Sequence, residues 1–178
     1  MKVVIIRHAE VDFDWSRECS SKGFDSDCNG YDNAPIKNIT YNIPEIGYKK
    51  VYISELSRSL NTAEKLFPDG DYTETGLINE VPLRSSYDTN RKMPLWFWNL
   101  SGRIQWLVNS ARQVEGRNKT KERARRFIAT VSQENMNCAV ITHGFYMHTL
   151  LDEMKKAGFR TNRSLVGYNN GEYVIAEK

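Results

Sequence analysis

A chain of 178 residues, 40% of them hydrophobic, is long enough for one folded domain with its own core. Its longest aliphatic run near the amino terminus is Val3 to Ile6, so the sequence predicts neither a secretory leader nor a membrane-spanning helix, and we expect a cytoplasmic protein. The formal charge is +3, and residues 112–126 are strongly basic, but this stretch has few neighbouring aromatic residues. It is therefore interpreted as a solvated helix face, and nucleic acid and membranes are not expected as partners.

The predicted strands and helices alternate along the chain. The first strand covers residues 3–6 and ends at Arg7, whereas residues 15–48 lack periodicity and predict a long surface connection. Further β-rich runs occupy residues 50–54, 75–81, 138–142 and 172–176. Helical patterns occupy residues 56–67, 94–113, 120–133 and the run that follows residue 143. Apolar strands that alternate with helices predict an α/β domain with a mainly parallel central sheet covered on both faces.

The boundaries of the third predicted helix are marked by two residues. Pro94 is expected in its first turn, and Gly116 is expected to end it. The three cysteines, Cys19, Cys28 and Cys138, are widely spaced and odd in number, which favours free thiols over a disulfide framework.

Two of the three histidines directly follow predicted buried strands. His8 follows VVII and Arg7, and His143 follows CAVIT. In open α/β sheets, ligands bind at the carboxyl ends of the strands, so these two histidines are expected to meet in a functional site. His148 lies five residues beyond His143 on the same predicted helix and is interpreted as structural.

A third strand end carries Arg58, in the first turn of the helix that follows residues 50–54. A cation at this position opposes the helix dipole, whereas an anion bound there would be stabilised by both the arginine and the free amides. An exposed arginine paired with Glu55 or Glu64 is the alternative. Together with Arg7, Arg58 predicts a binding site for a tetrahedral oxyanion such as phosphate.

The chemistry that these residues support is phosphoryl transfer. A neutral His8 can attack phosphorus, while Arg7, Arg58 and a protonated His143 offset the charge of the transition state. The leaving group also needs a proton donor, and Glu80, at a predicted strand end in LINEVPL, is the candidate. A surface glutamate before Pro82 is the alternative interpretation of Glu80.

The motifs resemble those of a known family in their order and spacing. Arg7-His8, Leu56-x-Arg58 followed by Thr62-Ala63, Glu80, and His143-Gly144 are similar to the four motifs of the histidine phosphatase superfamily, in its phosphoglycerate mutase-like branch 1. The resemblance implies a three-layer α/β sandwich and a phosphohistidine intermediate on His8. It further implies phosphate binding by Arg7, His8, Arg58 and His143, with Glu80 as proton donor and then base, and no metal or other cofactor.

The sequence also departs from the family's pattern. Ala9 stands where the family usually has glycine, and Asp14 stands where it often has a phosphate-contacting asparagine. A carboxylate at Asp14 would repel phosphate, so no phosphate contact is assigned to it. The family often has a helix with Gly and Gln before its second strand, and the segment NITYNIPEIGYKK predicts an irregular connection there instead.

Within a single domain of residues 1–178, residues 82–117 correspond to the family's helical cap. This segment is rich in tryptophan, and its aromatic stripe is interpreted as core rather than pocket. One helix face is expected to contain Trp98, Ser101 or Gly102 and Gln105, and another Trp96, Leu100 and Leu107. If the stripe lines the pocket, the substrate carries an apolar or planar group, with Arg84 and Arg91 available for a second anion.

The predicted function is hydrolysis of a phosphomonoester or phosphoprotein, with inorganic phosphate as product. A phosphoglycerate-type mutase and a non-catalytic module that binds a phosphorylated ligand remain as alternatives. A metallohydrolase with His8, His143 and Glu80 or Asp12 as ligands is disfavoured, because the two arginines would repel the cation. The sequence indicates neither the identity of the substrate nor the oligomeric state.

Overall fold

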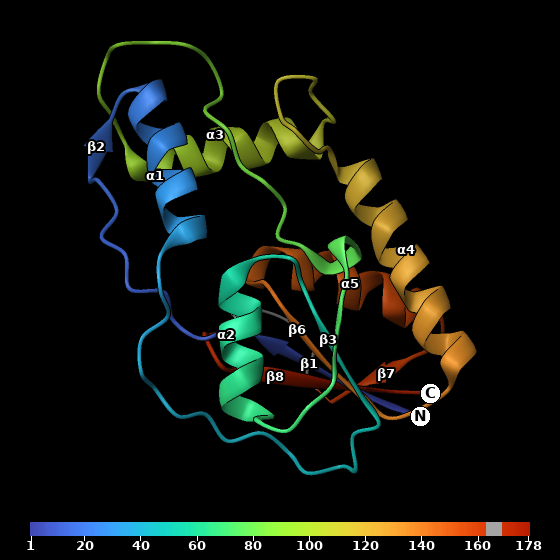
Figure 1. The fold of residues 1–178 in the computed structure, drawn as a ribbon. Coiled ribbons are helices and arrows are strands. Elements are labelled where there is room, and N and C mark those ends of the chain that lie inside the picture. The colour runs from blue at the N-terminus through green and yellow to red at the C-terminus, as the bar shows by residue number, and fades with distance from the viewer. Residues whose placement is uncertain (163–168) are drawn as a thin grey trace.

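A six-stranded sheet forms the centre of the protein (Figure 1). The computed structural model describes residues 1–162 and 169–178. The strand order is β4-β3-β6-β1-β8-β7, with β1 at Lys2–Arg7, β3 at Lys50–Ile53, β4 at Tyr72–Glu74, β6 at Cys138–Thr142, β7 at Arg160–Thr161 and β8 at Tyr173–Glu177. The first four strands of this order are parallel, whereas β8 is antiparallel to β1 and β7 to β8. The predicted α/β fold with a mainly parallel sheet is confirmed.

Helices cover both faces of the sheet and give three layers. The alternation of side chains along β1 sends Val3 and Ile5 to one face and Val4 and Ile6 to the other. Helices α4 (Arg117–Glu134) and α5 (Gly144–Lys156) pack on the first face, and α2 (Ser57–Leu66) packs on the second. All four of these strand side chains are fully buried, which fixes β1 in the middle of the core.

Two further helices lie beyond one end of the sheet (Figure 1). Helices α1 (Ser21–Asn33) and α3 (Leu95–Leu107) share a small apolar cluster built around Phe24 and Trp98. The short strands β2 (Glu18–Cys19) and β5 (Met93–Pro94) pair with each other beside them. Together these elements cover the carboxyl ends of the parallel strands, outside the three layers of the sandwich.

Helix α1 corrects the prediction that residues 15–48 form an irregular connection. It begins after Ser20, whose hydroxyl accepts a hydrogen bond from the Gly23 amide, and it buries only Ser21 and Phe24. Because so little of the helix is apolar, the sequence lacks the periodicity by which a helix is recognised. Residues 34–48 contain no helix or strand, in agreement with the irregular connection expected there.

The strand predicted at residues 75–81 was also wrong. The strand β4 ends at Glu74, and a 3-10 turn, η1 (Gly76–Ile78), follows it. The Thr75 hydroxyl accepts a hydrogen bond from the Leu77 amide and starts this turn. Glu80 therefore lies in a loop after a turn rather than at a strand end.

The boundaries of α3 differ from the prediction as well. Pro94 is the residue before the helix rather than part of its first turn, and the helix ends at Leu107. Gly116 begins α4 instead of ending α3. Between them the chain reverses through Asn109, whose φ of 57° lies in the left-handed region that asparagine tolerates. No helix within residues 1–162 and 169–178 is long and apolar enough to cross a bilayer.

Candidate active site

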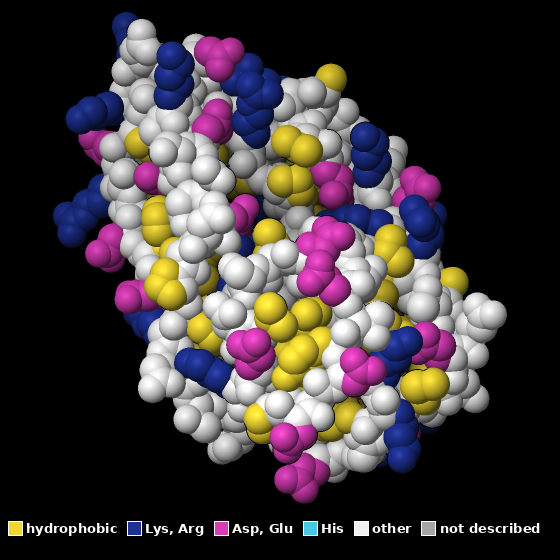
Figure 2. Space-filling model, viewed as in Figure 1, with side chains coloured by type: hydrophobic (Ala, Val, Ile, Leu, Met, Phe, Trp, Pro, Cys, Tyr) yellow, Lys and Arg dark blue, Asp and Glu magenta, His cyan; other side chains and the backbone are white. Residues whose placement is uncertain are grey.

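The register of two neighbouring parallel strands brings the two predicted histidines together. Arg7 at the end of β1 pairs with Thr142 at the end of β6, so the next residue on each strand leaves the sheet at the same edge. The rings of His8 and His143 lie 5.0 Å apart between centroids and are inclined by 53°. On the face shown in Figure 2, acidic and basic side chains are interspersed and no histidine side chain is visible.

The tautomer of His8 leaves one ring nitrogen without a proton. Its Nδ1 lies 2.7 Å from the carbonyl oxygen of Ala9, which accepts a hydrogen bond and therefore fixes the proton on Nδ1. The lone pair is then on Nε2. Burial, followed by the charge of Arg58, lowers the pKa of His8 to about 3, so the ring is neutral near pH 7. A neutral imidazole with a free Nε2 lone pair is the form that a nucleophile requires.

Backbone contacts from distant segments hold the turn that carries His8. The His8 amide donates to Thr142, and the Ala9 amide donates to the Thr62 hydroxyl at 2.9 Å. From the other side, the Asn170 side-chain amide donates to the carbonyl oxygens of both His8 and Ala9. The position of the imidazole is therefore fixed from three elements of the fold.

His143 is fully buried, and both of its ring nitrogens have partners. Arg58 Nε donates to His143 Nδ1 at 3.2 Å, and the Ser54 hydroxyl lies 2.7 Å from His143 Nε2. Ser54 donates its own proton to Ser59, so it accepts the proton of Nε2. Burial is the main cause that lowers the pKa of His143 well below its ordinary value, with smaller effects of His8 and the arginines. In these surroundings the neutral form of His143 is favoured, and the protonated form expected in the transition state requires a bound anion that raises its pKa again.

Arg58 connects His143 to a carboxylate that the sequence did not single out. Its side chain is 1% exposed, and its NH1 donates to Asp32 Oδ1 at 2.8 Å. The Arg58 guanidinium also lies over the ring of Tyr31, 5.1 Å from the centroid. Asp32 and Tyr31 end α1, the helix that the sequence did not reveal. The alternative pairing of Arg58 with Glu55 or Glu64 is not found, because the Arg58 ion pair is with Asp32.

Arg7 packs against the amino end of α5. A Cβ atom at Gly144 would lie 3.0 Å from Arg7 Nε and 3.1 Å from Arg7 Cζ. The absence of a side chain at Gly144 therefore lets the guanidinium approach the helix. This close approach explains in physical terms why a glycine follows His143.

Glu80 lies at the amino terminus of α5, where free amides point toward its carboxylate. Its Oε1 accepts hydrogen bonds from the amides of Val81 at 2.8 Å and Tyr146 at 3.0 Å, and its Oε2 accepts from Phe145 at 3.4 Å. Favourable contact with the helix dipole adds to these bonds. Glu80 is thus a carboxyl group of fixed orientation, at the edge of the sheet where His8 and His143 lie. Its three backbone partners do not fit the alternative interpretation of Glu80 as a surface residue.

A cleft of about 530 Å³ opens at this edge of the sheet. Its lining includes Asp32, Arg58, Glu80 and, from the segment of residues 82–117, Arg103. The Arg103 guanidinium lies 3.5 Å from the ring centroid of Phe145, and its NH1 donates to the Val81 carbonyl. Arg103 therefore extends from α3 toward the cavity that Arg58 and Glu80 line, whereas Arg7, His8 and His143 are not part of this lining.

Other residues considered from the sequence lie elsewhere. Asp14 is exposed and does not line the cleft, and neither do Arg84 and Arg91. His148 is exposed, contacts Phe145 edge-on and does not line the cleft. Across residues 1–162 and 169–178, no group of three or more His, Cys, Asp or Glu side chains is arranged to hold a metal ion.

Trp98 and Trp96 lie on different faces of α3, as the helical spacing predicted. Trp98 is fully buried against Phe24, with ring centroids 5.8 Å apart, whereas Trp96 is 64% exposed. Trp106 packs on Phe145, with its indole donating to Thr120. None of the tryptophans lines the cleft.

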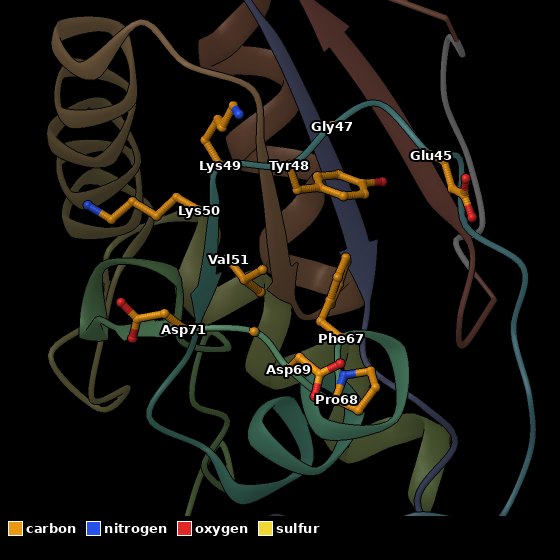
Figure 3. Close-up of a pocket in the computed structure, with 11 residues that line it drawn as sticks. Glu45, Gly47, Tyr48, Lys49, Lys50, Val51, Phe67, Pro68, Asp69 and Asp71 are labelled. Carbon is orange, nitrogen blue, oxygen red and sulfur yellow. The ribbon is translucent and has the colours of Figure 1, made fainter.

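A second cavity, of about 540 Å³, lies at the amino end of β3 (Figure 3). Figure 3 shows Tyr48 and Phe67 beside Val51, with Lys49, Lys50 and Asp71 around them. This cavity contains none of the predicted site residues and is at the opposite end of the strand from Ser54. Its size alone does not make it a catalytic site.

Comparisons with known proteins place the chain in a family. The family model for the histidine phosphatase superfamily (branch 1) matches residues 3–177. The comparison with curated proteins found no match.

Solved structures share the fold at low sequence identity. A mycobacterial glucosyl-3-phosphoglycerate phosphatase has a TM-score of 0.61 at 14% identity, and the match covers 98% of this chain and 88% of that one. A phosphoglycerate mutase from Bacillus anthracis also gives 0.61 at 14% identity, covering 98% and 86%. A phosphoserine phosphatase variant from Entamoeba histolytica, in complex with phosphoserine, gives 0.55 at 17% identity, covering 98% and 89%.

Proposed function

Because the chain belongs to the histidine phosphatase superfamily, branch 1, we propose that it hydrolyses a phosphomonoester through a phosphohistidine intermediate on His8. The observation that carries the proposal is the state of His8: a neutral ring with its proton fixed on Nδ1 by Ala9, beside the buried guanidinium of Arg58. A nucleophile without charge next to fixed cations suits attack on an anionic phosphoryl group.

In the first step, His8 Nε2 forms a bond to phosphorus as the ester P–O bond breaks. The electron pair of that bond goes to the leaving oxygen, which takes a proton from Glu80. Arg7 and Arg58 bind the phosphoryl oxygens, and His143 contributes once the anion raises its pKa. The hydrogen bond that Ser54 accepts from His143 Nε2 supports the ring throughout, whereas the bond from Arg58 Nε to Nδ1 is given up when Nδ1 takes a proton.

In the second step, water replaces the leaving group. The water oxygen attacks phosphorus, its proton passes to Glu80, and the electron pair of the N–P bond returns to His8. Inorganic phosphate leaves and the site is restored, so the cycle needs no metal or other cofactor. Residues 82–117 serve as the cap over the leaving group, a role supported by Arg103 in the lining of the cleft.

Quench-flow labelling with a generic aryl phosphate at neutral pH tests the mechanism. We expect an acid-labile, base-stable phosphoryl adduct in the unaltered protein and none in His8→Ala. His148→Ala is the matched control, because it removes an exposed histidine outside the cleft; it should keep the adduct.

One outcome would refute the phosphohistidine route, and three others would each favour a rival function. Fast turnover without a His8 adduct would rule out the phosphohistidine route, and loss of activity with a chelator that zinc restores would support a metallohydrolase. An adduct that persists until a second alcohol accepts the phosphoryl group would indicate a mutase. Phosphate binding without any turnover would indicate a non-catalytic module that binds a phosphorylated ligand.

A further inference from the structure

Asp32 places a carboxylate at the proposed phosphate site. Its Oδ1 accepts a hydrogen bond from Arg58 NH1 at 2.8 Å. The two partners differ in exposure, because 1% of the Arg58 side chain is exposed and 48% of the Asp32 side chain is. Both residues line the cleft. The pair therefore links a buried cation at the base of the site to an anion that a ligand in the cleft can reach.

This arrangement opposes the binding of phosphate. A phosphate that binds the remaining N–H groups of Arg58 places a second anion on the same guanidinium, and the repulsion between that anion and Asp32 lowers its affinity. The cost disappears if another cation neutralises Asp32 while the phosphate is bound. Such a cation can come from the ligand itself.

The surroundings of Asp32 leave room for a cation from the ligand. Asp25, Cys28, Asn29 and Asp32 follow helical spacing on α1, and all four line the cleft. Asp25 is held by the amide and the hydroxyl of Ser85. For Asp32, by contrast, the hydrogen-bond donor within residues 1–162 and 169–178 is Arg58. Its exposed carboxylate oxygens are thus free to accept from a donor in the cleft.

We propose that Asp32 is a specificity-determining residue that selects phosphate esters whose leaving group carries a cation such as an ammonium. This inference rests on the proposed function, because it assumes that the phosphate lies on Arg58. Phosphate, Arg58, Asp32 and the ammonium then alternate in charge along the cleft. An ester without the cation brings no positive charge to Asp32, and the repulsion is then offset by the arginines of the cleft alone, Arg58, Arg103 and Arg123.

Two ligands of nearly the same shape test the selection. O-phosphoethanolamine carries an ammonium where 2-hydroxyethyl phosphate carries a hydroxyl, and calorimetry in a His8→Ala background measures binding without turnover. We expect the first ligand to bind about tenfold more tightly, the size of one additional hydrogen bond between charged groups. Adding Asp32→Asn should bring the ratio close to one and should tighten the binding of inorganic phosphate.

Asp69→Asn in the same background is the control, because it removes the same charge from an exposed residue outside the cleft. It should preserve the ratio. Equal binding of the two ligands before Asp32 is changed would overturn the proposal, as would a ratio that Asp32→Asn leaves intact. Weaker phosphate binding in Asp32→Asn would make Asp32 a positioning residue for Arg58 and also overturn it. Since these readouts are affinities, they are separate from the adduct experiment, whose failure would refute the phosphohistidine route alone.

Discussion

The neutral, buried state of His8 has a consequence for stability as well as for chemistry. In the unfolded chain a histidine takes up a proton below pH 6.5, whereas His8 in the folded protein does so only near pH 3. The unfolded state therefore binds more protons between these values. The stability that this difference contributes is present above pH 6.5 and is lost as the pH falls toward 3.

We predict that the free energy of unfolding contributed by His8 falls by about 2 kcal/mol between pH 7 and pH 5. Urea unfolding of the unaltered protein and of His8→Gln at both pH values measures it. The variant should lose less stability on acidification, because it lacks the titrating ring. An identical pH dependence in both proteins would mean that His8 is charged, or freely titrating, in the folded state.

At the level of single residues, the site residues that directly follow strands could be predicted from the sequence. Arg7, His8 and His143 follow apolar runs, and parallel neighbours bring such positions to one edge. Asp32 and Tyr31 were not predictable in the same way, because a polar helix without an apolar face positions them. The neutral state of His143 depends on its burial against Ser54 and Arg58, which only the folded structure reveals.

Helix α3 presents two tryptophans to opposite environments. Trp98 is fully buried, stacks on Phe24, and donates from its indole to the Cys19 carbonyl at 3.0 Å. Trp96, two residues earlier, is 64% exposed and belongs to an apolar stripe that includes Leu100 and Ile104. The two tryptophans are therefore expected to contribute differently to the free energy of unfolding.

Alanine substitutions at the two tryptophans should separate these contributions. We predict that Trp98→Ala lowers the free energy of unfolding by about 3–5 kcal/mol, through the lost contacts and the cavity left behind. Trp96→Ala should cost less than about 1 kcal/mol, as expected for an exposed position. Chemical denaturation of both variants decides the matter, and similar losses in the two would contradict the packing of α1 on α3.

Elements with a strong apolar pattern were the ones that the sequence located well. Strands β1, β3, β6 and β8 and helices α2, α4 and α5 all contribute to the two main cores. The errors fell where local polar contacts decide the structure. Ser20 starts α1, and the hydroxyl of Thr75 starts a turn where a strand was expected.

At the scale of the whole molecule, residues near the end of the sequence pack against residues near its beginning. Strand β8 pairs with β1 along Lys2 to Ile6, and Asn170 binds the turn at His8. The amide of Gly171 donates to the Arg7 carbonyl as well. The central strand of the sheet thus depends on residues at the other end of the sequence.

Removal of residues 170–178 should therefore prevent cooperative folding, because it exposes one whole edge of β1. Near-UV circular dichroism and a urea titration measure this loss. Asn170→Ala, which keeps β8, should still fold and unfold cooperatively. A truncated chain with a native near-UV spectrum and a cooperative transition would show that the remaining sheet is sufficient.

The contact between Asn170 and His8 joins residues 162 positions apart, and this separation sets an order on assembly during translation. At about 5 to 20 residues per second, the turn at His8 waits roughly 10 to 30 s for its partner to be synthesised. Throughout that interval the backbone N–H and C=O groups on the β8 side of β1 have no strand partner, and the turn at His8 lacks its contact with Asn170. The segment that contains His8 is therefore made first and acquires its final contacts last.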